Sequence, residues 1–594
     1  MSHCAAGEIT LSPARLSELA NHTAWRALLH ANSANHSRIH DPHFFLATPP
    51  FNAKNELIAT LRGFQQPASL ADKHPICRFP ARFQWLSRQL QLSRASFPQP
   101  DCQQYHHFLN KVPANQIELV FASKNVVSPS SMMGHVFLKL AGKRSDGRHA
   151  EHAVTYFTLL DSFNVPKIVY QNFAGGMQGY FALQPYRRLK ENYLQREYRN
   201  IWEYQLTLQA WQRDMIRAHI WELKDIDSDY MFAAYNCATL TWYFMQIVAP
   251  EAFAHYPKLW VSPIDVIKTA SRHQLIRSTR VVTSNRWKIQ MLLDQSGIAS
   301  STLKSQLAAI TPEQATAAIQ ALPPANRLLA HAYLDYLQQS NPAALEQFPA
   351  ADAIQSALNR QSADYQIDYS HYKQPTRVPG NMQLRMETGR SSLRGNFAGL
   401  AWLPAANRLT DDQRQFFSAN ELRLGELSAR LYQGGHLQLE RATLYAVKSL
   451  SPWNGLTHNI SGQWQTGFTR QFDGQLHDHL VYQLSGGIGY SAKLTPDLLI
   501  YGLYNIGGAF NTATAYLYHY PEAGLFIDEV FNMKTSVTYE ARFNNYGDKQ
   551  RQDNIRACQS YYPDTNITLL ACYRHARNHH ASYSEGNLRF QIHF

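Results

Sequence analysis

The last eight residues, 587–594, read NLRFQIHF and alternate between polar and apolar side chains. Successive side chains of a β-strand point to opposite faces. One face of this strand is therefore apolar, and it carries Leu588, Phe590, Ile592 and Phe594. The other face carries amide, guanidinium and imidazole groups. The pattern predicts a strand that separates an apolar environment from a polar one.

The same kind of pattern extends back to about residue 376, in segments of about ten residues separated by polar or glycine turns. Examples are 421–432, 436–447, 479–494, 498–510 and 533–543. A strand that ends the chain on an aromatic residue resembles the C-terminal signature of bacterial outer-membrane barrels. We therefore predict an antiparallel transmembrane β-barrel over 376–594, with roughly 10–14 strands. A soluble β-sandwich or barrel is the alternative.

The composition of the 594 residues agrees with a membrane-facing sheet. Only 17% of the residues are charged, and 12% are aromatic, with 32 tyrosines among them. The net charge is +12, but the basic residues form no run, so the sequence predicts no nucleic-acid partner. Attraction to anionic lipid or lipopolysaccharide suits this charge better, and we expect the outer membrane itself as a partner.

The sequence contains six cysteines, and their spacing indicates the cellular compartment in which the protein folds. Cys77 with Cys102, and Cys558 with Cys572, are candidate disulfide pairs, which would leave Cys4 and Cys237 as thiols, although sequence alone does not fix the pairing. Such usage suits an oxidising compartment. The first residues show no secretory signal, so we expect an upstream start or a signal already removed.

Four segments precede or form the predicted barrel. Residues 1–110 are expected to be a helical N-terminal region, 111–295 an α+β domain, 296–375 a helical connector and 376–594 the barrel. Within these segments the residue patterns predict a helix over 55–63 capped by Asn55, strands over 116–123, 134–140, 152–160 and 199–206, and a helix from a Thr207 cap to about Lys224.

The run MFAAYNCATLTWYF, residues 231–244, places Cys237 among apolar and small residues. A thiol nucleophile needs a base and a group that orients the base. His135, at the start of a predicted strand, is the candidate base. A hairpin that turns near residue 144 would place His152 close enough to orient it. The alternative is that Cys237 is an ordinary core thiol.

Other residues around this pair are candidates for a substrate pocket. They are Ser130 and Ser131 in the preceding loop, Tyr156 on the returning strand and Asn236 beside the cysteine. The glycines of the loop at 172–181 could let that loop move. The sequence contains no HExxH motif, no paired CxxC and no nucleotide-binding glycine loop, so we predict neither a metal site nor a cofactor.

Several motifs together resemble a known bacterial family. The stretches at 22–47, 77–86, 119–140, 200–208 and 221–240 look like the family built around the N-terminal periplasmic domain of lipoprotein N-acyltransferase B (Lnb). The resemblance covers most of 20–290. The order of a histidine strand before an Asn-Cys helix is also similar to permuted papain-like enzymes such as lecithin:retinol acyltransferase. Ala233, Ala234 and Tyr235 depart from the polar residues that many relatives carry there.

The resemblance implies an outer-membrane protein with a permuted papain-like α+β domain in the periplasm. It implies that Cys237 accepts an acyl group from a phospholipid or lipoprotein and passes it to an amine or to water. A peptidoglycan amidase or peptidase with the same Cys–His pair is an alternative. A non-enzymatic scaffold of the cell envelope, anchored by the barrel, is another.

Overall fold

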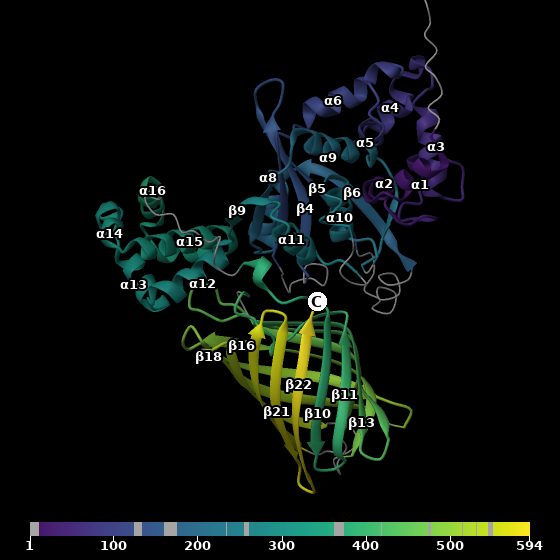
Figure 1. The fold of residues 1–594 in the computed structure, drawn as a ribbon. Coiled ribbons are helices and arrows are strands. Elements are labelled where there is room, and N and C mark those ends of the chain that lie inside the picture. Colours follow the sequence, from purple (N-terminus) through teal and green to yellow (C-terminus); the bar gives the residue numbers. More distant parts are fainter. Residues whose placement is uncertain are drawn as a thin grey trace, which may run out of the picture. The chain divides into compact units, whose positions relative to one another are not determined.

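The computed structural model describes residues 11–123, 133–159, 175–232, 234–254, 260–361, 374–416, 419–472, 477–513, 515–529, 531–544 and 551–594. The described chain divides into two compact units, and the boundary in the sequence lies between Val282 and Thr283. The first unit holds the N-terminal helices and a mixed α+β domain. The second holds a helical segment and a β-barrel. Figure 1 shows the helices and strands of both units.

The first unit is built on an antiparallel sheet of seven described strands in the order β8-β6-β5-β4-β3-β7-β9. Their bounds are β3 (Gln116–Ala122), β4 (His135–Lys143), β5 (His149–Thr158), β6 (Met177–Pro185), β7 (Ile201–Leu206), β8 (Ser228–Tyr230) and β9 (Ile276–Val282). The four strands predicted from the sequence in this region correspond to β3, β4, β5 and β7. Their apolar and β-branched composition explains why they were detectable.

Helices cover both faces of this sheet. The sheet-covering helices are α8 (Tyr186–Glu191), with the π-turn η6 (Asn192–Arg196), α9 (Ala210–Glu222), α10 (Cys237–Val248) and α11 (Pro263–Arg272). Phe137 and Ala153 pack against Tyr186 and Tyr193 of the α8–η6 segment. Side chains alternate along β4, so its neighbouring residues face the other layer, where α10 and α11 contact the strand (Figure 1).

The N-terminal region of the first unit is helical, as predicted. Its elements are α1 (Pro13–Asn21), α2 (Thr23–Leu28), β1 (Ala31–Ser33), β2 (His36–Ser37), α3 (Ala53–Gly63), α4 (Pro75–Arg78), α5 (Pro80–Gln89) and α6 (Gln103–Lys111). The helix predicted from Asn55 begins earlier, because the side chain of Asn52 caps it by accepting the N–H groups of Lys54 and Asn55. The helix predicted from Thr207 begins at Ala210, with Gln209 as its cap.

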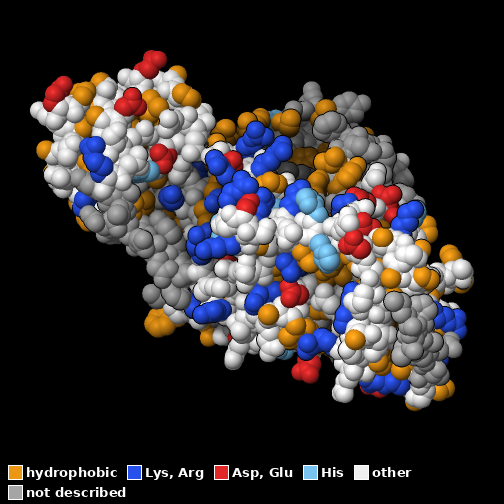
Figure 2. Space-filling view, turned by 90° about the horizontal axis from the view of Figure 1, so that it is seen from above, with side chains coloured by type: hydrophobic (Ala, Val, Ile, Leu, Met, Phe, Trp, Pro, Cys, Tyr) orange, Lys and Arg blue, Asp and Glu red, His pale blue; other side chains and the backbone are white. Residues whose placement is uncertain are grey.

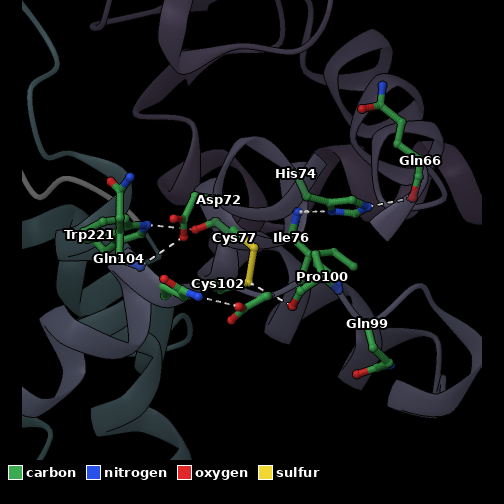
Figure 3. The surroundings of a disulfide bond; sticks show 12 residues. Gln66, Asp72, His74, Ile76, Cys77, Gln99, Pro100, Cys102, Gln104 and Trp221 are labelled. Atoms are coloured by element: carbon green, nitrogen blue, oxygen red, sulfur yellow. Dashed lines mark hydrogen bonds between the residues drawn. A yellow bond between two sulfur atoms is a disulfide. The ribbon is translucent and has the colours of Figure 1, made fainter. Parts of the chain in front are cut away.

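Both candidate disulfides are formed in the structure. Cys77 of α4 is joined to Cys102, the residue before α6, and Trp221 donates its ring N–H to the carbonyl of Cys77 at 2.8 Å (Figure 3). The second disulfide joins Cys558 and Cys572 on neighbouring barrel strands. Cys237 is the free cysteine among the described residues.

The second unit begins with a helical segment that includes the predicted connector. Its helices are α12 (Asn285–Ser296), α13 (Ser300–Ala309), α14 (Ala315–Ala321), α15 (Pro324–Ser340) and α16 (Ala351–Gln361). They share a core to which Leu456, from a turn between barrel strands, also belongs. Lys493 of the barrel pairs with Asp294 of α12 at 3.0 Å. The helical segment therefore packs against one end of the barrel rather than acting as a free linker.

Twelve described strands close into an antiparallel barrel, because β11 pairs with β13 as well as with β10. The strands are β10 (Gln383–Ser391), β11 (Gly395–Leu403), β13 (Ala419–Tyr432), β14 (Leu437–Leu450), β15 (Ser461–Phe472), β16 (Asp478–Lys493), β17 (Leu498–Phe510), β18 (Ala515–Glu529), β19 (Met533–Asn544), β20 (Arg551–Asp564), β21 (Ile567–Arg577) and β22 (Ser582–His593). A short strand, β12 (Ala405–Asn407), adds to β13. The count falls within the range predicted from the sequence.

The barrel strands carry apolar side chains outward and polar side chains inward. On β22, Leu588 is 62% exposed while Asn587 is buried. The outer face also presents Leu400, Leu484, Ile488, Ile506 and Leu517, all about half exposed or more. A closed barrel with an apolar exterior satisfies its backbone internally and suits a bilayer.

Two further observations concern the surface and the helices. None of the described helices combines the length and apolar composition that a membrane span requires. Figure 2 shows a face of the molecule on which lysine and arginine side chains are more widespread than acidic ones, in agreement with the net charge of +12.

Candidate functional site

Cys237 is the first residue of α10, and the residue before it fixes the start of this helix. The side-chain oxygen of Asn236 accepts the N–H of Thr239 at 2.9 Å, and its NH₂ group donates to the carbonyls of Phe232 and Val261. These bonds use both N–H groups of the amide. Asn236 therefore caps the helix and positions Cys237, and its role in binding substrate stays a prediction.

The fold brings Cys237 next to the strand that begins with His135. The backbone N–H groups of Val136, Ala238 and Cys237 lie near enough to the Cys237 sulfur to favour its thiolate and so to oppose the rise of its pKa. Val136 directly follows His135, whose ring centre lies 6.4 Å from that of Tyr193 in the α8–η6 layer. Within the described chain no hydrogen bond joins the two side chains. The pairing of Cys237 with His135 therefore stays a prediction.

Burial raises the pKa of the Cys237 thiol to about 11, although the three N–H groups and the nearby Arg199 favour the thiolate. Burial also lowers the pKa of His135 to about 3, and Arg199 adds to this shift. Both groups are therefore neutral at physiological pH. The resting pair consists of a thiol and a neutral imidazole, not of a thiolate and an imidazolium.

Arg199 is a charged residue that acts on both Cys237 and His135. Its guanidinium donates to the carbonyl oxygens of Ala122 and Ser123, at 2.8 and 2.7 Å, and lies 4.8 Å from the centre of the Tyr193 ring. Ala122 is the partner of His135 in the β3–β4 pairing. Arg199 thereby ties the end of β3 to the segment before β7, and its guanidinium, which also pairs with Glu197 at 3.0 Å, supplies positive charge near the thiol.

Gly134 controls how the chain enters β4. Its φ is +83°, a left-handed conformation that favours glycine, and a Cβ atom there would lie 2.6 Å from the ring of Phe121. No other type of amino acid would fit both that backbone angle and that small space. The glycine therefore sets the position of the adjacent His135.

His152 does not lie across from His135. The β4–β5 register pairs Leu140 with His152 and Lys139 with Ala153. His152 is thus five residues further along β4, about 17 Å away at the usual rise per residue, and on the opposite face of the sheet. The expectation that it orients the base is wrong.

Tyr156 is buried rather than lining an open pocket. Its hydroxyl accepts a hydrogen bond from Ser228 at 3.1 Å, and its ring packs against those of Tyr230 and Tyr235. Tyr230 in turn lies near Cys237, whose backbone N–H opposes the rise that burial causes in the pKa of the Tyr230 phenol. Ser130 and Ser131 lie outside the described residues.

A buried polar relay begins at Tyr235, two residues before Cys237. The Tyr235 hydroxyl donates to Nδ1 of His30 at 2.5 Å, and the Nε2 atoms of His30 and His219 are 2.9 Å apart. Nδ1 of His219 contacts Glu222 at 2.9 Å, and Glu222 accepts the N–H groups of Ala81 and Arg82. The relay links the turn before Cys237 to the N-terminal helices.

Sequence reasoning missed Arg199 and every member of the relay. Its members come from α5 and α9, from the turn before α10 and from the segment after α2, and only the fold brings them together. Arg82 and Glu222 lie inside stretches that resemble the Lnb family, which was the available signal. Within the described ranges, no group of three or more His, Cys, Asp or Glu side chains is placed to hold a metal ion.

The reactivity of Cys237 toward a small alkylating agent should depend steeply on pH. With a pKa near 11, its thiolate fraction, and so its rate with iodoacetamide, should rise about tenfold per pH unit between about pH 7 and pH 9. The rate is measured by mass spectrometry of the Cys237 peptide, in a Cys4→Ser background. A rate that levels off below about pH 8 would instead indicate a thiolate–imidazolium pair. The urea-unfolded chain, with an ordinary thiol, is the control.

Three segments of the chain match family models. Residues 104–273 match the Lnb N-terminal periplasmic domain. Residues 373–593 and 17–89 match two domains of unknown function, DUF7840 and DUF7843. No match was found among curated proteins.

Solved structures similar to the chain are outer-membrane barrels that align with 36% of it. A loop L8 deletion mutant of OmpT, an outer membrane protein of Vibrio cholerae, is 11% identical over 97% of its own length, with a TM-score of 0.22. The KdgM porin in complex with disordered oligogalacturonate is 11% identical over 99% of its length, with a TM-score of 0.22. The NanC porin is 9% identical over 100% of its length, with a TM-score of 0.25.

Proposed function

We propose that this chain, an outer-membrane β-barrel protein with an Lnb N-terminal periplasmic domain, is a cysteine-dependent acyltransferase or acyl hydrolase that acts on a phospholipid or lipoprotein. The observation that carries the proposal is the position of Cys237. It is the first residue of α10, it lies near the backbone N–H of Val136, and its helix contacts β4, the strand of His135.

The order of these elements supports a permuted papain-like arrangement. The histidine strand β4 precedes the cysteine helix α10, and the helix packs on the sheet that contains the strand. A helix N-terminus favours negative charge on the sulfur and on an adjacent oxyanion. These features are what a thiol acyl enzyme needs, whereas a core thiol has no need of donors directed at it.

In the first step, His135 takes the thiol proton while the sulfur of Cys237 attacks an ester carbonyl. The C–S bond forms, and the N–H groups at the start of α10 stabilise the tetrahedral oxyanion. The ester C–O bond then breaks, and the leaving oxygen takes the proton from His135. The products are a thioester on Cys237 and an alcohol, which is a lysophospholipid when the donor is a phospholipid.

In the second step, an amine or water attacks the thioester. His135 takes a proton from the attacking group and returns it to the sulfur as the C–S bond breaks. An amine gives an amide and therefore acyl transfer, whereas water gives hydrolysis. Because the resting thiol and imidazole are both neutral, the proton moves during the attack rather than beforehand.

The test is to trap the thioester on the full chain. The protein is reconstituted in vesicles that contain a phospholipid whose acyl chain ends in an alkyne, and the attached chain is labelled with a fluorophore. We expect one adduct, on the peptide that contains Cys237, and its release by neutral hydroxylamine, which cleaves thioesters. The Cys237→Ala variant should show no adduct, and the Cys4→Ser variant should label as the wild type does.

Two results would contradict the proposal. If Cys237 reacts with iodoacetamide in the folded protein but never carries the acyl chain, the thiol acts on another class of substrate. If Cys237 reacts only after the chain is unfolded, it is a core residue. The periplasmic domain would then be better explained as a scaffold.

A further inference from the structure

The barrel encloses a cavity whose wall is strongly basic. The cavity has a volume of about 240 Å³ and is lined by eight arginines and Lys448, against the three acidic residues Glu421, Glu522 and Glu540. These charged side chains project from barrel strands, except that of Arg408, which lies in the loop before β13. Positive charge enclosed in this way is costly unless anions compensate it.

Nearby carboxylates are already shared among several arginines. Glu426 lies within 4 Å of four guanidinium groups, those of Arg385, Arg408, Arg423 and Arg441. The distance to Arg441 is the longest of the four, at 3.9 Å. Arg423 also pairs with Glu421 at 2.7 Å, so two carboxylates face four cations and this network leaves positive charge on the wall of the lumen.

Two arginines on neighbouring strands lie directly opposite each other. Arg556 of β20 pairs in register with Arg574 of β21, and like charges in such positions repel. Among the described residues no carboxylate lies within 4 Å of either side chain, and Arg574 donates instead to the amide oxygen of Asn554 at 2.9 Å. The next inward-facing pair along the two strands is the Cys558–Cys572 disulfide, which fixes this register.

Arg556 also faces arginines from other strands. It interacts electrostatically with Arg441 of β14, with Arg589 of β22 and with Arg574, and the carboxylate of Glu540 acts on both Arg556 and Arg574. Guanidinium groups from four strands therefore converge on one part of the cavity. Planar forks that approach from several directions suit a tetrahedral oxyanion, which can accept hydrogen bonds on every side.

We propose that the lumen of the barrel binds a tetrahedral oxyanion of the phosphate class between Arg556 and Arg574. The anion is either free phosphate or the phosphomonoester group of a lipid. It bridges the two opposed guanidinium groups and offsets the positive charge of the wall. This site is separate from Cys237 and does not depend on the function proposed above.

The proposal is tested by calorimetric titration of the full chain in a non-ionic detergent with inorganic phosphate, against chloride at matched ionic strength. We expect saturable binding of phosphate and a Kd at least tenfold higher in Arg556→Gln and in Arg574→Gln. Arg551→Gln is the matched control, because Arg551 lies on the same strand, is not among the residues that line the cavity and pairs with Asp553 at 2.9 Å. Its Kd should equal that of the wild type. Heat-dependent gel mobility confirms that each variant barrel is folded.

A second titration uses a short-chain phosphatidic acid and distinguishes the two sources of the anion. Tighter binding of this lipid than of phosphate assigns the site to a lipid phosphomonoester, and equal or weaker binding assigns it to the free ion. No binding of either beyond that of chloride would overturn the proposal. The same holds if binding survives in the Arg556→Gln/Arg574→Gln double variant while its barrel remains folded.

Discussion

Replacement of His135 by glutamine should lower the rate of acyl-enzyme formation by roughly 10²- to 10⁴-fold, the usual contribution of a general base. Glutamine keeps a polar side chain of similar size but cannot take the thiol proton. Burial keeps the pKa of Cys237 at about 11, so the thiol depends on a base during attack. The measurement is the initial rate of thioester formation with the alkyne-labelled phospholipid.

A matched control is available on the next strand. His152→Gln changes a buried histidine of the same sheet, but on the opposite face and five residues further along. We expect its rate to stay within about threefold of the wild type. The alkylation of Cys237 should be unchanged in His135→Gln, because the groups that shift the thiol pKa are backbone N–H groups and Arg199. Equal losses in both histidine variants would show that the sheet, and not the base, is being perturbed.

The placement of His152 shows that the sequence could not predict the register of the β4–β5 hairpin. The strands were detectable, but the register depends on where the hairpin turns. The turn was expected near residue 144, whereas the structure continues β4 to Lys143 and turns around Asp146, with Gly147 at a φ of +81°. A shift of two residues at the centre of a hairpin moves every cross-strand partner by four. The predicted neighbour of His135 was therefore lost.

The barrel was more predictable than the site. Alternation is a local property, so the eight residues that end the chain already indicate which side chains face lipid. The Cys237–His135 pair was suggested by residue type and by the family resemblance. The relay from Tyr235 to Glu222 left no local signal, because a buried histidine such as His30 looks like any other histidine until the fold surrounds it. The charge excess of the lumen likewise emerges only when the strands close.

Replacement of Arg82 by methionine should lower the free energy of unfolding of the first unit by about 3–5 kcal/mol. Arg82 is fully buried: it pairs with Glu56 at 2.7 Å, donates to the carbonyl of Phe44 at 2.7 Å and lies 4.0 Å from Glu222. Methionine fills a similar volume but leaves two buried carboxylates without their cation. Pulse proteolysis of the full chain across a urea gradient measures the change.

Two comparisons separate the loss of charge from the loss of packing. Arg62→Met on α3 removes an exposed arginine and should change the free energy by less than about 0.5 kcal/mol. The triple variant Arg82→Met/Glu56→Gln/Glu222→Gln removes the buried cation and both carboxylates together, and the glutamines still accept backbone N–H groups. It should recover at least half of the loss, since replacing a whole buried ion network is often close to neutral. A triple variant no more stable than Arg82→Met would assign the effect to packing around Phe44 and Phe79.

The loss in Arg82→Met should also depend on pH, with a sign that follows from Glu222. Burial raises the pKa of Glu222 to about 7, and the positive charge of Arg82 opposes this shift, so the pKa rises further without the arginine. A carboxyl whose pKa is higher in the folded than in the unfolded state holds its proton in the folded state. Stability therefore increases as the pH falls through the folded pKa. The variant should be most destabilised at about pH 9 and least at about pH 6, where protonation neutralises the unpaired carboxyl. A loss independent of pH would show that Glu222 keeps a charge partner other than Arg82.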